Sequence, residues 1–292
     1  MQKRSKDTRN PSTPAANCNP EFSKNVSTLR IESAHNERFK YWLDLQNNAR
    51  SRRKSGLFLV EGEQECQYAL QGGLELVEWI LHAQSTSFPP ERWGVIPIQL
   101  SDALFDRLAY RGRNAGCMAV FRQTAPALPE APEVVLVLEN AEKPGNLGAL
   151  IRTALASGVE AVLATGSGAD LYNPNCIRSS VGTVFRLPCV AMSQAEALDS
   201  LIRWGLTAVL LRLDGSEPLY SQSLPRKAAY VLGSEHAGLS DFWAPLALEQ
   251  AGLSHRSVRI PMAQSMDSLN LSASAAVVLY EAYRQRLLPN SH

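Results

Sequence analysis

The sequence has little that would place the protein in a membrane or outside the cell. Its 292 residues contain no apolar run long enough to cross a bilayer, and the opening MQKRSKDTRNPSTPAANCNP lacks a hydrophobic signal core. The five cysteines are odd in number and form no CxxC pair, which argues against a disulfide framework and against a thiolate zinc site. We therefore expect a cytoplasmic protein with no membrane contact and no metal.

Net charge is nearly absent as well. The formal charge is only +1 at pH 7, but a neutral total does not exclude nucleic-acid binding, because the position of the charges decides it. The length and the 45% hydrophobic content suffice for two modest domains, each with its own core.

Composition divides the chain into four segments. Residues 1–26 are rich in Lys, Arg, Ser and Pro, and we expect a disordered basic tail, for which an organelle-targeting role stays open. Residues 27–123 show helical spacing and short apolar strands, the pattern of a small α/β domain. Residues 124–133 contain three prolines and predict a linker, and residues 134–289 alternate strands with helices in a second α/β domain.

Three loops of unusual composition belong to the second domain: ENAEKPGNLG, GSEHAGLS and IPMAQSMDSLNLS. Strands that alternate with helices pair in parallel and gather their ligand loops at the carboxyl ends. Gly145 and Gly148 allow a tight turn, and we expect Arg152, one helical turn after Gly148, to project from the first turn of the following helix. Glu235 is a candidate because it stands at a strand end, whereas His236 receives no role.

The loop before the terminal helix holds more hydroxyl and amide side chains than capping needs. One such residue caps the free N–H groups at a helix N-terminus. Here four stand close together: Ser268, Asn270, Ser272 and Ser274. Because exposed N–H groups also bind polar ligands, ordinary capping and a ligand site both stay open on this pattern alone.

The order and spacing of the three loops resemble a known enzyme family. NxGxxxR at Asn146, Gly148 and Arg152, then LGSExxGLS, then IPM with SLNLS look like the three motifs of the SpoU family, also called TrmH, of RNA ribose 2′-O-methyltransferases. The resemblance covers about residues 134–288. The second motif departs from the usual wording, with His236 and Ala237 where a glycine often follows the glutamate, which leaves the loop shape open.

A second resemblance lies upstream. Residues 36–62, which run through a basic stretch into FLVEG, are similar to the opening of the L30e-like substrate-binding domain of many family members. The basic residues that we expect to contact RNA phosphates, with a solvated charged face as the alternative, are Arg50, Arg52, Arg53 and Lys54.

The resemblance implies an α/β fold with two parts. The C-terminal part is a SPOUT domain whose parallel sheet is threaded into a deep trefoil knot, and the small N-terminal α/β domain is L30e-like. S-adenosyl-L-methionine is the implied cofactor, held by Gly233, Ile260 and Leu269. The implied catalytic residues are Asn146, Arg152, Glu235, Ser268 and Asn270. A homodimer is implied, and we expect its contacts to include Val277, Tyr280 and Tyr283.

The resemblance places Arg152 at the ribose, where the family's arginine has been proposed as the base. Arginine is normally protonated, so bidentate orientation of a phosphate is the alternative role. The predicted reaction is methylation of a ribose 2′-hydroxyl. We favour ribosomal RNA, because of the separate N-terminal domain. A transfer-RNA methyltransferase and a catalytically inactive RNA-binding or ribosome-assembly factor of the same fold are the alternatives.

Two further hypotheses concern the residues around ATGSGADL. This stretch begins like a dinucleotide-binding GxGxxG, but Leu171 replaces the third glycine and no helix opens there, so we reject a dinucleotide oxidoreductase. Asp170, Asn173 and Arg178 either meet RNA or a partner subunit, or simply form turns.

Overall fold

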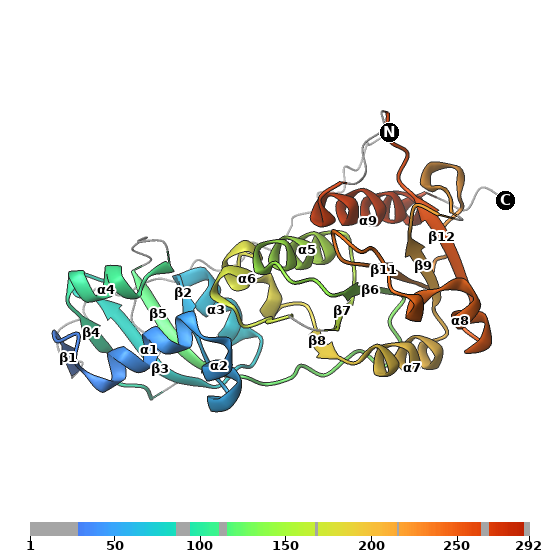
Figure 1. Cartoon of the computed structure of the whole chain (residues 1–292). Coiled ribbons are helices and arrows are strands. Elements are labelled where there is room, and N and C mark those ends of the chain that lie inside the picture. Colours follow the sequence, from blue (N-terminus) through green and yellow to red (C-terminus); the bar gives the residue numbers. More distant parts are fainter. Residues whose placement is uncertain are drawn as a thin grey trace, which may run out of the picture.

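The structure is a computed structural model that describes residues 29–85, 94–110, 116–166, 169–214, 216–263 and 269–288. It contains two β-sheets placed next to one another and covered by helices (Figure 1). The predicted tail at residues 1–26 and the predicted catalytic Ser268 lie outside the described residues. None of the described helices has the length and apolar composition needed to cross a membrane.

The N-terminal sheet has five strands in the order β1-β4-β3-β5-β2. β5 runs antiparallel to β2 and β3, whereas β3, β4 and β1 are parallel. Phe39, Trp42 and Leu45 lie on one face of the first helix and are fully buried, as their helical spacing predicts. The elements of this part are β1 (Leu29–Ile31), α1 (Glu37–Asn47), α2 (Ala49–Ser55), β2 (Leu57–Glu61), α3 (Glu63–Gln71), β3 (Leu76–His82), β4 (Ile98–Leu100), α4 (Asp102–Leu108) and β5 (Cys117–Arg122).

The C-terminal sheet has seven strands in the order β10-β12-β9-β11-β6-β7-β8, and every strand pair in its described residues is parallel. The alternation of strands and helices therefore gives the predicted parallel sheet. The elements are β6 (Val134–Glu139), α5 (Pro144–Ala156), β7 (Ala161–Thr165), α6 (Pro174–Ser179), β8 (Cys189–Met192), α7 (Gln194–Trp204), β9 (Thr207–Leu211), β10 (Glu217–Pro218), β11 (Ala228–Leu232), α8 (Pro245–Gln250), β12 (His255–Arg259) and α9 (Leu271–Leu287).

Strand β6 shows why this sheet lies between two layers of helices. Val134, Leu136 and Leu138 join the core shared with α5 and α9, whereas Val135 and Val137 join the core shared with α7 and α8. Because successive side chains of a strand point to opposite faces, a strand that is apolar throughout is buried on both. Figure 1 shows α5 and α9 above the strands and α7 below them.

The parallel order brings the predicted loops to one edge of the sheet. β11 lies directly between β6 and β9, and β12 follows β9 on the other side. The carboxyl ends of parallel strands share an edge, so the loops after β6, β11 and β12 meet there. The trefoil knot stays a prediction, since the loop before α9 includes residues 264–268, which lie outside the described residues.

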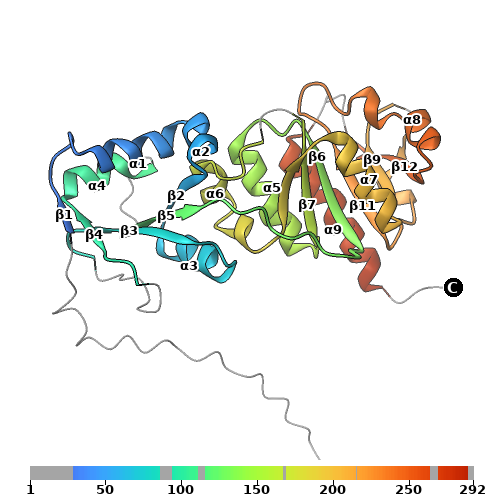
Figure 2. The ribbon, with the colours of Figure 1, turned by 90° about the horizontal axis from the view of Figure 1, so that it is seen from below.

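One hydrophobic core continues from the first sheet into the second. Val60 of β2 belongs to the same buried cluster as Leu171 and Val184. Helix α6 packs against both β2 and α5, and Figure 2 shows it between the N-terminal sheet and the helices of the second. Residues 123–133 contain neither helix nor strand.

Candidate functional site

Three side chains from the starts of two helices, α5 and α9, converge on the carboxylate of Glu235. Asn270 Nδ2 lies 2.9 Å from Glu235 Oε1, and the Asn146 side-chain amide donates to the same oxygen. Lys143 forms an ion pair with the other oxygen, Oε2. The two amides also approach one another, with 3.5 Å between Asn270 Nδ2 and Asn146 Oδ1. The structure thus brings together the predicted Asn146, Glu235 and Asn270.

Helix ends hold these side chains in place. Asn270 is the N-cap of α9, and its Oδ1 accepts hydrogen bonds from Ser272 N at 3.0 Å and from Ser272 Oγ at 2.6 Å. Its oxygen therefore faces the helix, which leaves the amide nitrogen to donate to Glu235. Lys143 occupies the N-cap position of α5, directly before Pro144. Asn270 therefore both caps α9 and donates to the carboxylate of the candidate site.

Glu235 is held in its ionised form. The hydrogen bond from Lys143 is the main cause that lowers the pKa of Glu235 below its ordinary value, and the Leu271 backbone N–H and the charge of His236 act in the same direction. Partial burial opposes them. An ionised carboxylate only accepts hydrogen bonds, so it can receive both amides and the ammonium at once.

A cavity of about 380 Å³ adjoins this cluster. The three predicted cofactor residues, Gly233, Ile260 and Leu269, all line it. The other lining residues are Leu211, Arg212, Leu213, Asp214, Leu232, Ser234, Glu235, His236, Ala237, Gly238, Leu239, Arg259, Met262, Leu271 and Ser274. This volume and mixed lining are typical of sites for small organic ligands.

Gly233 is required by the shape of the loop that forms one wall of the cavity. Ser234 and Gly238 exchange two backbone hydrogen bonds of 3.1 Å, which folds the loop back on itself. A Cβ atom at residue 233 would lie 2.0 Å from the Gly238 carbonyl oxygen. Gly238 has φ of +66°, a conformation that favours glycine.

The same loop is tied to the sheet by Glu139, a residue that the sequence interpretation did not single out. This carboxylate is 1% exposed at the end of β6. It accepts hydrogen bonds from Ser240 N at 2.8 Å, from Ser240 Oγ at 2.5 Å and from the Gln194 side chain. An acidic residue in the otherwise apolar VVLVLE was the available signal. Lys143 had no comparable signal.

The sequence predicted that Arg152 projects from the first turn of its helix, and this prediction is wrong. Helix α5 begins at Pro144, so Arg152 lies in its third turn, about 9 Å along the axis from Asn146. The side chain is exposed, and none of the described residues forms a hydrogen bond or ion pair with it. The predicted turn at Gly148 is also wrong. Gly148 lies within α5, where a Cβ atom would come 2.0 Å from Ser179 Oγ of α6.

The predicted RNA-contacting residues separate into two groups. Arg50, Arg53 and Lys54 are exposed on α2. Arg52 is 2% exposed and pairs with Asp170, so the prediction that it meets RNA phosphates is wrong, because no surface of its guanidinium is free.

The three polar residues for which RNA contact, subunit contact or turn formation was left open each have a partner within the chain. Asp170 forms the ion pair with Arg52, and Asn173 caps α6 by accepting from Asn175 N at 2.9 Å. Arg178 lies over the ring of Tyr110 at 5.7 Å from its centroid.

No group of three or more His, Cys, Asp or Glu residues suited to a metal ion occurs in the part of the chain that the structure describes.

Comparison with known families gives two matches. Residues 133–280 match the SpoU rRNA Methylase family, and residues 36–119 match the MRM3-like substrate binding domain. The first match covers the strands of the seven-stranded sheet, and the second covers most of the five-stranded sheet.

Known proteins are similar over most of the chain. The 23S rRNA (uridine(2479)-2′-O)-methyltransferase of Streptomyces viridochromogenes is 30% identical, over 87% of this chain and 92% of its own. The 23S rRNA (guanosine(2553)-2′-O)-methyltransferase RlmP of Bacillus subtilis is 29% identical, over 86% and 98%. The crystal structure of the SpoU methyltransferase AviRb from S. viridochromogenes in complex with AdoMet is 26% identical, with a TM-score of 0.73 over 86% of this chain and 98% of that chain.

Proposed function

Because this chain belongs to the SpoU rRNA methylase family, we propose that it methylates a ribose 2′-hydroxyl of large-subunit ribosomal RNA. The observation that carries the proposal is the convergence of Asn146, Asn270 and Lys143 on Glu235 beside a cavity of about 380 Å³. A purely structural loop cluster would have no need for a ligand-sized cavity at its side.

The residues of the cavity fit S-adenosylmethionine, the cofactor of the family. Leu211, Leu232 and Ile260 offer apolar walls for an adenine ring, and the backbone at Gly233 approaches the cavity without a side chain. Charged side chains of both signs line the same cavity, Asp214 and Glu235 with Arg212 and Arg259, so it offers partners for the charged groups of the cofactor. S-adenosylmethionine, when bound, supplies a methyl group on a positively charged sulfur.

The chain's own residues supply alignment. A ribose hydroxyl is a weak nucleophile, so the reaction needs a fixed approach and a route for its proton. Both oxygens of Glu235 are engaged by donors, and we assign it the task of holding Asn146 and Asn270 in place. Arg152, exposed on α5, would meet the RNA, either as a clamp on a phosphate or as the base.

The substrate assignment rests on the relatives. The two named above modify a uridine and a guanosine of 23S rRNA, so the ribose, which all nucleotides share, is the group common to them. We propose ribosomal rather than transfer RNA, and a cytoplasmic enzyme that acts where ribosomes are assembled. Residues 27–123 would bind the RNA, residues 124–133 would link the domains, and residues 134–289 would carry the reaction.

We also propose a homodimer that includes α9 in its interface. Tyr280 is 48% exposed and lies against Tyr283, with 6.3 Å between the ring centroids. An exposed aromatic side chain packed against a half-buried one on the same helix is typical of a surface that a second chain covers. Light scattering at enzyme concentrations that support methyl transfer would contradict this assembly if it gave the mass of one chain.

The test of the function is direct. Purified protein is incubated with S-adenosylmethionine carrying a labelled methyl group and with either ribosomal or transfer RNA lacking the modification. Label that stays on a ribose of 23S rRNA, located by resistance to alkaline hydrolysis, supports the proposal. Label on transfer RNA instead would establish the alternative substrate. Cofactor binding without transfer to any RNA would favour an inactive binding factor.

A further inference from the structure

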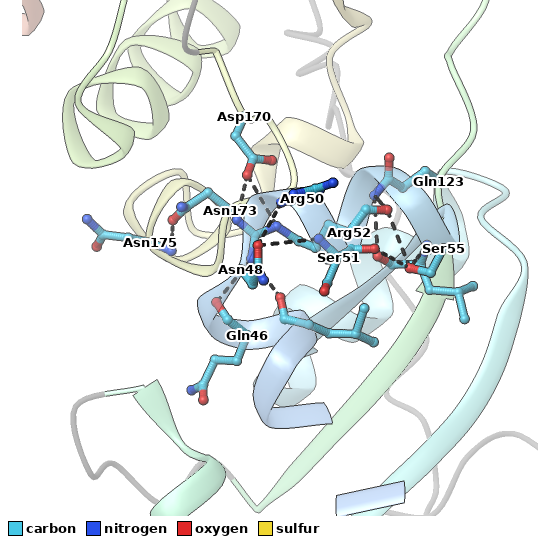
Figure 3. A network of polar contacts seen from close by, with 12 residues as sticks. Gln46, Asn48, Arg50, Ser51, Arg52, Ser55, Gln123, Asp170, Asn173 and Asn175 are labelled. Atoms are coloured by element: carbon cyan, nitrogen blue, oxygen red, sulfur yellow. Dashed lines mark hydrogen bonds and ion pairs between the residues drawn. The ribbon is translucent and has the colours of Figure 1, made fainter. Parts of the chain in front are cut away.

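Arg52 is a buried cation that crosses the boundary between the two domains. Its side chain is 2% exposed, and its Nη2 and Nε atoms lie 2.5 Å and 3.2 Å from Asp170 Oδ2. Nη1 donates to the backbone oxygens of Leu45 at 2.6 Å and Gln46 at 3.0 Å (Figure 3). A guanidinium without a carboxylate would be strongly destabilising at this depth, so the position of α2 depends on Asp170.

Helix α2 is fixed at both ends around this residue. Asn48 caps its start by accepting from Arg50 N at 2.9 Å, and Gly56 ends it with φ of +66°. Gln123 Nε2 donates to the Arg52 carbonyl oxygen at 2.9 Å. With Arg52 turned inward, the basic neighbours on the same short helix are turned outward: Arg50, Arg53 and Lys54.

On the other side, Asp170 is connected to the polar cluster through close packing. Its carbonyl oxygen accepts a hydrogen bond of 3.1 Å from the backbone N–H of Asn173, the residue that caps α6. Ser179 Oγ of α6 donates to Asn175 O at 2.6 Å and lies 3.4 Å from the carbonyl of Pro144, the first residue of α5. The close approach of α6 and α5 at Gly148 leaves no room for a Cβ atom. Helix α5 carries Asn146, which binds Glu235.

The Arg52–Asp170 ion pair lies beside a packed apolar contact between the two domains. Phe58 of β2 packs against Tyr172, with 4.4 Å between the ring centroids, and against Phe185 at 5.8 Å. Tyr172 Oη donates to the carbonyl of Thr124 at 2.9 Å. Two well-packed surfaces joined by a buried ion pair have one preferred arrangement, because a shifted arrangement would leave the charges unpaired.

We propose that Arg52 and Asp170 are positioning residues for methyl transfer, which hold the exposed basic face of α2 at a fixed place relative to the Glu235 cluster. The inference rests on the proposed function, since it assumes that α2 holds RNA while the cluster acts on a ribose. RNA bound by the first domain then presents its target in register. Loss of the Arg52–Asp170 ion pair leaves the RNA contacts intact but misplaces the ribose. A misplacement of about 1 Å can reduce the rate of a reaction by about a hundredfold.

The test compares full-length variants in single-turnover methyl transfer, with 23S rRNA and S-adenosylmethionine both saturating. Asp170→Asn keeps the side-chain size and removes the charge. We expect its rate to fall by about tenfold to a hundredfold, with RNA affinity and cofactor affinity close to those of the original protein. Small-angle scattering reports the separation of the domains independently of activity, and we expect a larger radius of gyration.

The double variant Arg52→Met/Asp170→Leu separates positioning from charge. Replacing a buried ion pair by apolar residues of similar size often preserves packing, so we expect the rate to recover most of its original value. The salt dependence of RNA binding should be unchanged, because Arg52 does not touch RNA. A shallower salt dependence in the double variant would assign Arg52 a direct RNA contact and overturn the inference.

Two controls complete the comparison. The Arg122–Glu75 ion pair also joins an arginine to a carboxylate, at 2.8 Å, but it is exposed and lies within the first domain, so Arg122→Met should leave the rate unchanged. Arg53→Met should weaken RNA binding and reduce its salt slope by about 1. A folded Asp170→Asn protein with an unchanged saturated rate would refute the positioning role. Absence of transfer by the original protein would instead reject the proposed function, and the inference with it.

Discussion

Lys143, at the start of α5, forms an ion pair with Glu235, which follows β11, although the two residues lie 92 positions apart in the chain. Lys143 is 63% exposed and Glu235 only 16%, so the pair stands at the mouth of the site with its carboxylate inside. The ammonium keeps the carboxylate charged, and the charged carboxylate accepts from both asparagines. The arrangement of the cluster therefore depends on the ionisation of Glu235.

Loss of this ammonium should change how stability depends on pH. The pKa of Glu235 is lowered in the folded protein, so the pair stabilises the fold above the ordinary glutamate pKa of about 4.3 and loses this effect as the pH falls through the lower folded pKa. We expect Lys143→Met to lower the melting temperature most at neutral pH. The difference from the original protein should shrink as the pH falls below about 4.

An exposed pair provides the matched control for this measurement. Lys40 lies 2.7 Å from Glu37 on α1, with both side chains open to solvent, so Lys40→Met should have little effect at any pH. A melting-temperature difference for Lys143→Met that stays constant between about pH 3 and pH 7 would show that the ionisation of Glu235 is not involved.

Asn270 performs two tasks that substitution can separate. Its oxygen caps α9, and its nitrogen donates to Glu235. Serine caps a helix about as well as asparagine but cannot reach Glu235 with an amide, whereas alanine loses the cap at a cost of about 1 kcal/mol. We expect Asn270→Ser to keep its stability in urea unfolding and to lose at least about tenfold in methyl transfer. Full activity in Asn270→Ser would leave Asn270 with the capping role alone.

Gly148 should resist replacement by alanine despite the better helix propensity of alanine. A Cβ atom there would lie 2.0 Å from Ser179 Oγ and 2.3 Å from the Cys176 carbonyl oxygen, so α5 and α6 would have to move apart. We expect Gly148→Ala to destabilise the protein by about 1–3 kcal/mol in urea unfolding. Gly145→Ala is the control in the same helix, because its nearest neighbour is a side-chain atom at 3.3 Å. Equal stabilities of the two variants would contradict the packing argument.

The sequence allowed the meeting of Asn146, Glu235 and Asn270 to be predicted, because all three lie in loops that follow strands of an α/β pattern and in motifs that resemble those of the SpoU family. The direction of Arg52 could not be predicted in this way. Helix α2, ARSRRKS, has no apolar residue beyond its first alanine to mark an inward face, and the partner of Arg52 lies 118 positions later. Tertiary pairing, which local periodicity does not contain, selects the buried arginine. The start of α5 was also misjudged, because Lys143 and Pro144 begin the helix before the glycines that suggested a turn.

The three outward basic residues of α2 should account for part of the salt dependence of RNA binding. Each phosphate contact releases counterions, so the slope of log affinity against log salt should fall by about 0.9 for each phosphate that is no longer neutralised. We expect the combined replacement of Arg50, Arg53 and Lys54 by glutamine to flatten the slope and to leave S-adenosylmethionine binding unchanged. Fluorescence anisotropy with an rRNA fragment measures the slope. An unchanged slope would show a solvated face that does not bind RNA.

Arg152 offers the most direct test of the reaction itself. Its exposed side chain forms no hydrogen bond or ion pair with the described residues, so Arg152→Ala should keep folding and S-adenosylmethionine binding. Methyl transfer should fall by at least about a hundredfold, because the contact with RNA that we propose for this arginine stabilises the transition state. Arg152→Lys then distinguishes the two roles. Lysine keeps the charge without the planar fork, so poor recovery indicates bidentate binding of a phosphate, whereas recovery with a shifted pH–rate profile indicates proton removal. Normal methylation by Arg152→Ala would contradict both roles.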